Sequence, residues 1–319
     1  MRWSSWVGRL LAAGVALAAA TSGAAPARSS PKPIAEYGSI SVGHPGSGFL
    51  INGVPMPRGE EWVITAPNHR WGTQETIDAL IHCIERIHHQ FPGSPPVMLG
   101  SISARRGGRI PPHQTHRTGR DADVYFFRKP GANWAAAATR EDIDLPRTWG
   151  LLRCFITETD VDHILIDRKP QQWLKEYALQ SGEPASWVEG LFSDTSARAS
   201  TAVRYAPGHV AHMHVRFVSP IARRLGVALY DRLEREGYIK PAYITVQHTV
   251  RQGETLSEIA QKYHTPLNAI KRQNRLKSTN LTPGQKLSIR QRATVRDART
   301  PVTVPRRRLP PDVASGSPT

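Results

Sequence analysis

The segment His209-Val-Ala-His-Met-His-Val-Arg-Phe-Val218 alternates in the manner of a β-strand from Ala211 onward. Side chains two residues apart on a strand project from the same face, so His212 and His214 are predicted to point together. Earlier in the chain stands His113-Gln-Thr-His-Arg-Thr-Gly-Arg-Asp-Ala-Asp123. Imidazole and carboxylate are ligands of catalytic zinc, which typically takes three protein ligands and keeps an open position for water. Together the two segments predict a metal site carried by a sheet.

Further helices and strands are predicted around these two segments. Residues 77–89 carry apolar side chains at helical spacing, and helical periodicity returns at 221–237. Strand-like runs occur at 95–102, 123–127 and 163–166. Because these elements follow no regular βαβ repeat, we expect an α+β fold rather than a doubly wound sheet. The expected architecture is a small antiparallel sheet with flanking helices that carries the zinc site.

Composition divides the chain into segments. Residues 28–48 are rich in Pro, Gly and Ser and are predicted to be an extended lead-in, followed by the α+β domain at 49–240. Residues 246–290 have the spacing of a small βααβ module. Residues 291–319 contain Arg306-Arg-Arg308 and few apolar side chains, so this basic, proline-rich tail is predicted to be disordered.

The first 25 residues are predicted to be a secretory signal peptide. The apolar run Leu10 to Ala20 is preceded by Arg2 and directly by Arg9, and small residues follow it at 21–27. This run is too short to cross a bilayer, and no other segment is apolar enough to do so. We therefore expect an exported, periplasmic protein without a transmembrane segment.

The charge of the chain predicts an anionic partner. There are 42 Lys and Arg against 26 Asp and Glu, which gives a formal net charge of +16. Nucleic acid is one anionic partner, but export opposes it and favours an extracellular surface such as a cell wall. A solvated basic face without a binding role is the alternative.

Cys83 and Cys154 are the two cysteines of the sequence. Export makes a disulfide possible, but spacing alone does not show that the two sulfur atoms meet. A disulfide and a pair of buried thiols both remain open.

The module at 246–290 resembles a LysM domain over its full length. Thr255-Leu-Ser-Glu258 has the pattern of a helix capping box, and Pro283-Gly284 marks a turn before the last strand. The resemblance implies binding of glycans that contain N-acetylglucosamine, such as peptidoglycan. The implied groove is formed by two loops, with candidate contacts at Gly253, Glu254, Thr255, Leu256, Asn280, Leu281 and Pro283.

The two histidine segments resemble one family. Gly107-Gly108 precede His113-x-x-His116-x-x-Gly119-x-Asp121-Ala-Asp123, and the second motif is His209-x-Ala-His-Met-His-Val-Arg216. This pattern resembles the penicillin-insensitive murein endopeptidases, part of a wider metallopeptidase group that includes lysostaphin, hedgehog-type and D-Ala-D-Ala carboxypeptidase folds. The resemblance covers roughly residues 40–218 and is loose outside the motifs.

That resemblance implies a role for each residue. Zinc would be bound by His116, Asp123 and His214, the general base would be His212, and further active-site histidines would be His113 and His209. Asp121 is expected to orient a ligand from behind, with a turn or capping role as the alternative. Arg117 and Arg120 depart from the family, which more often has Gln and an apolar residue there, and this leaves substrate preference and local charge open.

Metal and histidine chemistry together predict a hydrolase. Zinc lowers the pKa of bound water to about 7, and a histidine can accept the water proton and return it to the leaving amine. We predict a peptidoglycan endopeptidase that cuts peptide cross-links, with the D-alanyl–meso-diaminopimelate bond implied by the resemblance. A D,D- or L,D-carboxypeptidase and an inactive LysM scaffold are the alternatives. His and Asp also accept other divalent ions, so the metal itself stays open.

Overall fold

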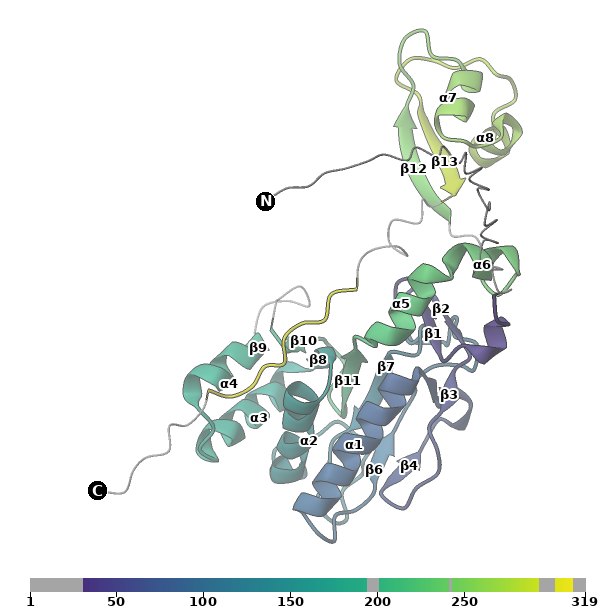
Figure 1. The fold of residues 1–319 in the computed structure, drawn as a ribbon. Helices are drawn as coiled ribbons and strands as arrows, with labels where there is room; N and C mark the ends of the chain where they lie inside the picture. Colours follow the sequence, from purple (N-terminus) through teal and green to yellow (C-terminus); the bar gives the residue numbers. More distant parts are fainter. Residues whose placement is uncertain (1–30, 194–200, 241–242, 293–301, 312–319) are drawn as a thin grey trace, which may run out of the picture. The chain divides into compact units, whose positions relative to one another are not determined.

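The computed structural model describes residues 31–193, 201–240, 243–292 and 302–311 (Figure 1). The predicted signal peptide lies outside these ranges. All elements below belong to the unit Ile34–Thr319. Within the described ranges, no helix combines the length and apolar character needed to cross a membrane.

A seven-stranded sheet forms the centre of the first domain (Figure 1). In spatial order its strands are β4 (Trp62–Ile64), β6 (Val97–Leu99), β7 (Asp121–Tyr125), β11 (His212–Phe217), β8 (Val161–Ile166), β10 (Val203–Tyr205) and β9 (Phe192–Ser193). The four central strands pair antiparallel, as predicted. The edge pairs β4–β6, β8–β10 and β10–β9 are parallel. The α+β class is confirmed, and the sheet is larger and more mixed than expected.

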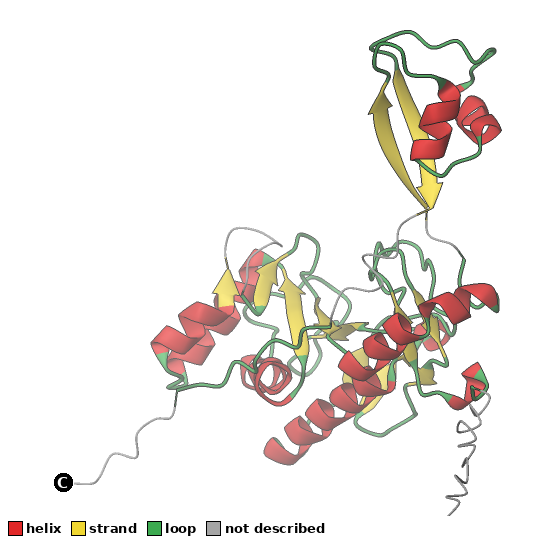
Figure 2. Cartoon of the chain, turned by 45° about the horizontal axis from the view of Figure 1, so that its top comes forward, coloured by secondary structure: helices red, strands yellow, loops and turns green. Residues whose placement is uncertain are grey.

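Four helices bury one face of this sheet. They are α1 (Gln74–Gln90), α2 (Leu145–Glu158), α3 (Arg168–Gln180) and α4 (Ala185–Leu191), shown in red beside the yellow strands in Figure 2. The apolar stripe predicted on α1 is buried. Thr73 caps the start of the helix, and its side chain accepts a hydrogen bond from the backbone N–H of Thr76. Alternate residues of the central strands, such as Val124 and Val215, pack in the same core. The residues between them therefore face the opposite side of the sheet.

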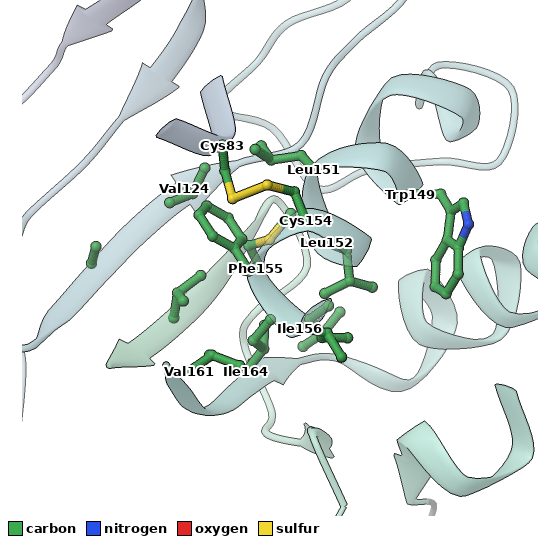
Figure 3. Packing of buried hydrophobic residues seen from close by; sticks show 14 of the residues in the cluster. Cys83, Val124, Trp149, Leu151, Leu152, Cys154, Phe155, Ile156, Val161 and Ile164 are labelled. Carbon is green, nitrogen blue, oxygen red and sulfur yellow. A yellow bond between two sulfur atoms is a disulfide. The ribbon is translucent and has the colours of Figure 1, made fainter. Parts of the chain in front are cut away.

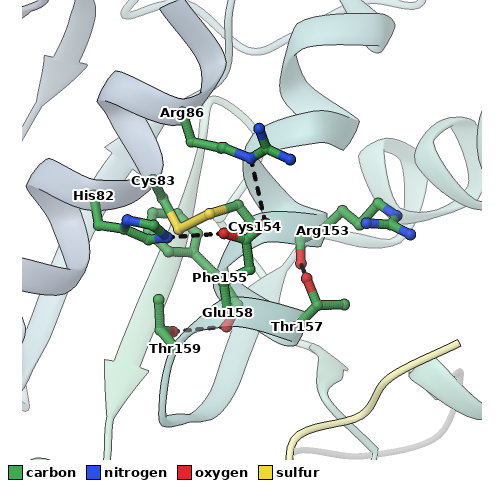
Figure 4. The surroundings of a disulfide bond; sticks show 9 residues. All are labelled: His82, Cys83, Arg86, Arg153, Cys154, Phe155, Thr157, Glu158 and Thr159. Carbon is green, nitrogen blue, oxygen red and sulfur yellow. Dashed lines mark hydrogen bonds and ion pairs between the residues drawn. A yellow bond between two sulfur atoms is a disulfide. The ribbon is translucent and has the colours of Figure 1, made fainter. Parts of the chain in front are cut away.

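A disulfide joins α1 to α2. Cys83 and Cys154 are bonded inside the core, so the question left open by the sequence is answered in favour of the bridge (Figure 3). On the surface beside it, the Glu158 carboxylate lies 2.9 Å from His82 Nε2 and 3.5 Å from Arg86 Nε (Figure 4). The two helices are thus held together by a covalent bond in the core and by ionic contacts at its rim.

A second apolar cluster lies under the hairpin of β1 (Ile40–Val42) and β2 (Phe49–Ile51). It contains residues of this hairpin, of the turn η1 (Ile34–Glu36) and of α6 (Tyr230–Arg235). The helix predicted at 221–237 is two helices, because α5 (Pro220–Ala228) ends at Leu229. Gly226 allows α5 to approach β1, since a Cβ there would lie 2.1 Å from the backbone oxygen of Ser41.

Smaller elements complete the first domain. The strands β3 (Val54–Pro55) and β5 (Trp71–Gly72) pair antiparallel, and the turn η2 (Pro67–His69) lies between them in sequence. Residues 302–311 form no helix or strand. They contact α4, because the backbone oxygen of Arg308 accepts a hydrogen bond from Trp187 Nε1. The rest of the basic tail lies outside the described residues, and its disorder stays a prediction.

The C-terminal module has the predicted βααβ order. It consists of β12 (Tyr243–Thr249), α7 (Leu256–Lys262), α8 (Leu267–Asn274) and β13 (Lys286–Arg292). The capping box of Thr255 and Glu258 is formed at the start of α7. Apolar residues from all parts of the module form its own core.

Asn274 fastens α8 to β13 in this module. Its Nδ2 donates to the backbone oxygens of Ile270 and Ser288 at 2.9 and 2.7 Å, and its Oδ1 accepts from the Ser288 N–H at 2.7 Å. Asn274→Ala leaves these backbone groups without their partner and is expected to cost about 2 kcal/mol. Protected amides of 243–292 should then exchange about thirtyfold faster in hydrogen-exchange mass spectrometry of the full chain. The exposed Asn280→Ala is the matched control, and equal exchange in both variants would contradict this role.

Candidate active site

The pairing of β7 with β11 brings the two histidine segments together. His214 lies opposite Asp123, and Arg216 lies opposite Asp121. Because partners in register project from the same face, all four side chains stand on the face of the sheet that the helices leave uncovered. His116 reaches this face from the loop before β7. Residues far apart in sequence thus meet at one place.

Three ligand-type atoms form a compact triangle. His116 Nε2 lies 3.1 Å from His214 Nδ1 and 3.2 Å from Asp123 Oδ1, and the last two atoms are 3.1 Å apart. Each of the three side chains is at least nine-tenths buried. The ligand atoms of His113, His116 and Asp123 likewise all lie within 4.8 Å of one another. The cluster is therefore a candidate metal site.

The hydrogen bonds behind the triangle fix the form of both imidazoles. His116 Nδ1 lies 2.9 Å from the backbone oxygen of Ile102, which can only accept, so Nδ1 carries the hydrogen. His214 Nε2 lies 3.0 Å from Asp121 Oδ1 and donates to it in the same way. In the neutral rings the lone pairs of His116 Nε2 and His214 Nδ1 then face the triangle. This is the arrangement that outer partners impose on metal-binding histidines.

Asp121 contacts both of these histidines from behind the triangle. Its Oδ1 also accepts from Arg216 Nε at 2.6 Å, and its Oδ2 accepts from the backbone N–H of His116 at 3.1 Å. That last bond supports His116 in a left-handed conformation with φ of +64°, which is uncommon for a residue other than glycine. Asp121 thus holds the backbone of one candidate ligand and the side chain of another.

Opposite charges stabilise this buried cluster. Burial alone would raise the pKa of Asp121, but Arg216 and His214 lower it well below its usual value. The pKa of Asp123 is lowered in the same sense, against burial, by His116 and His214. For His214, burial would lower the pKa, and the two aspartates raise it to about 9. The centre is therefore a place where positive charge is strongly favoured.

The triangle fits a tetrahedral zinc ion. Ligand atoms about 2.0–2.1 Å from such an ion lie about 3.3–3.4 Å from one another. The three separations of 3.1–3.2 Å among His116, Asp123 and His214 are close to this value. Two neutral nitrogens and one carboxylate are also a donor set that zinc accepts.

The remaining predicted histidines surround the triangle. His212 Nε2 lies 3.8 Å from Asp123 Oδ1, and His113 Nδ1 lies 3.7 Å from Asp123 Oδ2. The ring of His209 is 5.1 Å from that of His212 and 5.9 Å from that of His214. Burial lowers the pKa of His212 to about 4, and burial also lowers the pKa values of His113 and His209. All six predicted site residues with ligand or histidine roles are therefore brought together.

Arg117 and Arg120, the two departures from the resembled pattern, both contact the segment of the β1–β2 hairpin. Arg120 is 4% exposed and turns toward the β1 hairpin, where its Nε donates to Ser41 Oγ at 3.1 Å. Burial and the nearby Arg223 lower its pKa to about 10. The backbone oxygen of Arg117 lies where a side chain on Gly107 would clash, 2.2 Å from the Cβ position, which explains a glycine there. Gly107 itself has φ of +66°.

Tyr125 and Trp134 were missed from the sequence. The Tyr125 ring lies 5.3 Å from that of His212, and Trp134 meets Tyr125 edge to face at 4.8 Å. Tyr125 follows Asp123 by two residues on β7, so the alternation that grouped His212 with His214 also identifies it. For Trp134, in an irregular loop, the sequence offered no comparable signal.

The candidate glycan contacts of the C-terminal module fall into two groups. Leu256 is 1% exposed and packs in the module core, so its side chain serves the fold. Glu254 accepts from the backbone N–H of Arg251 and lies 2.9 Å from His248 Nε2, while Thr255 caps α7. Gly253, Asn280, Leu281 and Pro283 are at least partly open to solvent, although Leu281 also packs against the module core and the Asn280 N–H donates to Ser278 Oγ at 3.2 Å.

Comparisons with known proteins agree with this division of the chain. Residues 41–178 match the penicillin-insensitive murein endopeptidase family, and residues 248–290 match the LysM domain. A stretch of 48 residues is 46% identical to the "Probable autolysin SsaALP" of Staphylococcus aureus (strain NCTC 8325 / PS 47), and this covers 15% of the chain and 18% of that protein. The first match contains His113, His116 and Asp123 and ends before β11, so the second half of the triangle rests on the strand pairing.

Proposed function

Since the chain carries a penicillin-insensitive murein endopeptidase region followed by a LysM domain, we propose that it is an exported zinc endopeptidase that cuts peptide cross-links of peptidoglycan. The observation that carries this proposal is the triangle of His116 Nε2, Asp123 Oδ1 and His214 Nδ1. Both imidazoles are oriented by acceptors behind them, and the donor set suits zinc. Bound zinc would supply a Lewis acid and a water of lowered pKa.

The proposed general base is His212. Its low pKa of about 4 leaves the imidazole neutral at neutral pH, so it can accept a proton from water. Its Nε2 is close to Asp123 without belonging to the triangle, which places it beside the candidate ligands. Once protonated, it can return the proton to the leaving amine of the cleaved peptide bond.

His113 and His209 are proposed to stabilise the oxyanion. Both rings lie within 6 Å of a triangle histidine, at 4.5 Å between His113 and His116 and 5.9 Å between His209 and His214. A ring N–H that faces the reacting carbonyl can donate a hydrogen bond to the negative oxygen as it develops.

The LysM domain is proposed to hold the enzyme on its substrate. Association with the cell wall follows from the two matched families, and the basic charge of +16 favours an anionic wall. The proposal includes export to the periplasm by residues 1–25. It also includes the D-alanyl–meso-diaminopimelate bond as the bond that is cut.

Product analysis tests the proposal. The full chain is incubated with purified cross-linked peptidoglycan, with zinc or with a chelator, and the fragments are separated by chromatography. We expect cross-linked dimers to become monomers only where metal is present. Release of free alanine alone would identify a carboxypeptidase, and binding without any cleavage would identify a wall-binding scaffold.

Asp121→Asn is expected to weaken metal binding about 10- to 100-fold without removing a ligand. The amide keeps the shape of the carboxylate but loses the charge that holds His214 and Arg216. Competition with a chromophoric chelator measures the dissociation constant. Asp78→Asn, an exposed aspartate on α1, is the control, and equal affinities of the two variants would contradict the orienting role of Asp121.

A further inference from the structure

A cavity of about 560 Å³ opens beside Tyr125. It lies where β6 begins, β7 ends and α2 begins, and its apolar wall includes Val63, Met98, Tyr125 and Trp134. Tyr125 contacts the ring of His212 on one side and that of Trp134 on the other. The cavity is thus connected to the proposed general base through Tyr125, which lines the one and contacts the ring of the other.

The apolar wall is open to solvent. Val63 on β4 is 43% exposed and lies beside Met98 on β6 in register. A single exposed valine needs no explanation on a protein surface. Here it forms one wall of a concave site together with two aromatic rings, which is the usual composition of a ligand site.

Three cationic residues line the cavity, and two of them are already paired. Arg128 binds the Asp142 carboxylate at 2.5 Å, and Arg147 binds that of Asp144 at 2.7 Å. Lys129 is exposed and has no carboxylate within ion-pair distance in the part of the chain that the structure describes. An apolar, aromatic wall with one available ammonium suits an aliphatic group that bears a carboxylate.

We infer that this cavity binds the diamino-acid side of the cross-link, with the aliphatic chain against Trp134 and Met98 and the free carboxylate on Lys129. This inference rests on the proposed function. In a D-alanyl–meso-diaminopimelate cross-link, the diamino acid carries a carboxylate on the carbon that bears the scissile amide nitrogen. A carboxylate so close to the bond being cut can enter a cavity whose wall includes Tyr125, the residue in contact with His212.

Binding of two matched cross-linked dimers tests the inference separately from cleavage. In one dimer the group beside the scissile amide is a free carboxylate. In the other dimer this carboxylate is replaced by a carboxamide, and the rest is identical. Isothermal titration calorimetry uses the full chain with His212→Ala, so that the dimers stay intact. We expect the carboxylate dimer to bind about tenfold more tightly, the size of one hydrogen bond to a charged group. Lys129→Gln should abolish this preference, Lys129→Arg should retain it, and Lys169→Gln, an exposed lysine on α3, should leave it unchanged.

Trp134→Ala gives an independent readout of the apolar wall. It should weaken binding of both dimers about tenfold, because the aliphatic chain loses its aromatic surface. Equal binding of both dimers to the His212→Ala chain, or an equal loss for both in Lys129→Gln, would overturn the inference. A preference for the carboxylate dimer without cleavage by the wild type would overturn the proposed endopeptidase and leave the binding site standing.

Discussion

His116→Ala is expected to abolish cleavage of cross-linked peptidoglycan, with a loss of at least about a thousandfold in kcat/KM. The variant removes one of three ligand atoms that lie 3.1–3.2 Å apart, so the remaining two would hold zinc weakly. A metal ion contributes several kcal/mol to transition-state stabilisation in such sites, which accounts for the size of the effect. The measurement is the rate of conversion of purified dimers to monomers, with the bound metal determined by elemental analysis.

His89→Ala is the matched control for this variant. His89 is an exposed histidine in the last turn of α1 and belongs to no ligand cluster among the described residues. It should keep both full metal content and full activity. Chelation of the wild type should reproduce the His116→Ala rate, and added zinc should restore the wild type alone. Full activity of His116→Ala after chelation would contradict the assignment of a metal site.

Reduction of the disulfide is expected to lower the free energy of unfolding of the first domain by about 4 kcal/mol. Cys83 and Cys154 are separated by 71 residues, and a bridge across a loop of that length strongly restricts the unfolded chain. The bridge also joins α1 and α2 across the buried core (Figure 3). Guanidinium unfolding followed by tryptophan emission measures this domain selectively, because residues 243–292 contain no tryptophan.

Two comparisons isolate the contribution of the bridge. Oxidised and reduced wild type differ only in the S–S bond, so the shift of their midpoints gives the effect of the cross-link. The Cys83→Ala, Cys154→Ala double variant adds the loss of two buried sulfur atoms and should be at least as unstable as the reduced protein. Coincident transitions of oxidised and reduced protein would show that the bridge does not stabilise the domain.

Much of the candidate site could be predicted because strand geometry is local. The two-residue period of β11 placed His212 and His214 on one face, whereas the strand predicted at 123–127 left out Asp121, the residue at which β7 begins. The sequence could not predict that His214 lies opposite Asp123, since pairing register depends on the whole sheet. The left-handed backbone of His116 and its bond to the Ile102 carbonyl also depend on tertiary contacts.

The fold was predictable where elements are long and periodic. The stripe on α1 and the alternation of β11 were identified from sequence, whereas β9 and β10 are two or three residues long and too short to show a period. The break between α5 and α6 at Leu229 interrupts a run whose apolar period continues, so helical periodicity did not reveal it. The disulfide was undecided because the separation of two cysteines along the chain does not give their distance in space.

The β7–β11 pairing also determines when, during synthesis, the triangle can be completed. His116 and Asp123 are synthesised first, and the third residue of the triangle, His214, is added only with β11. A nascent chain that ends before β11 has two of the three ligand atoms and lacks the proposed base as well. The complete triangle therefore forms only when β11, the strand of the antiparallel centre that comes last in the chain, pairs with β7.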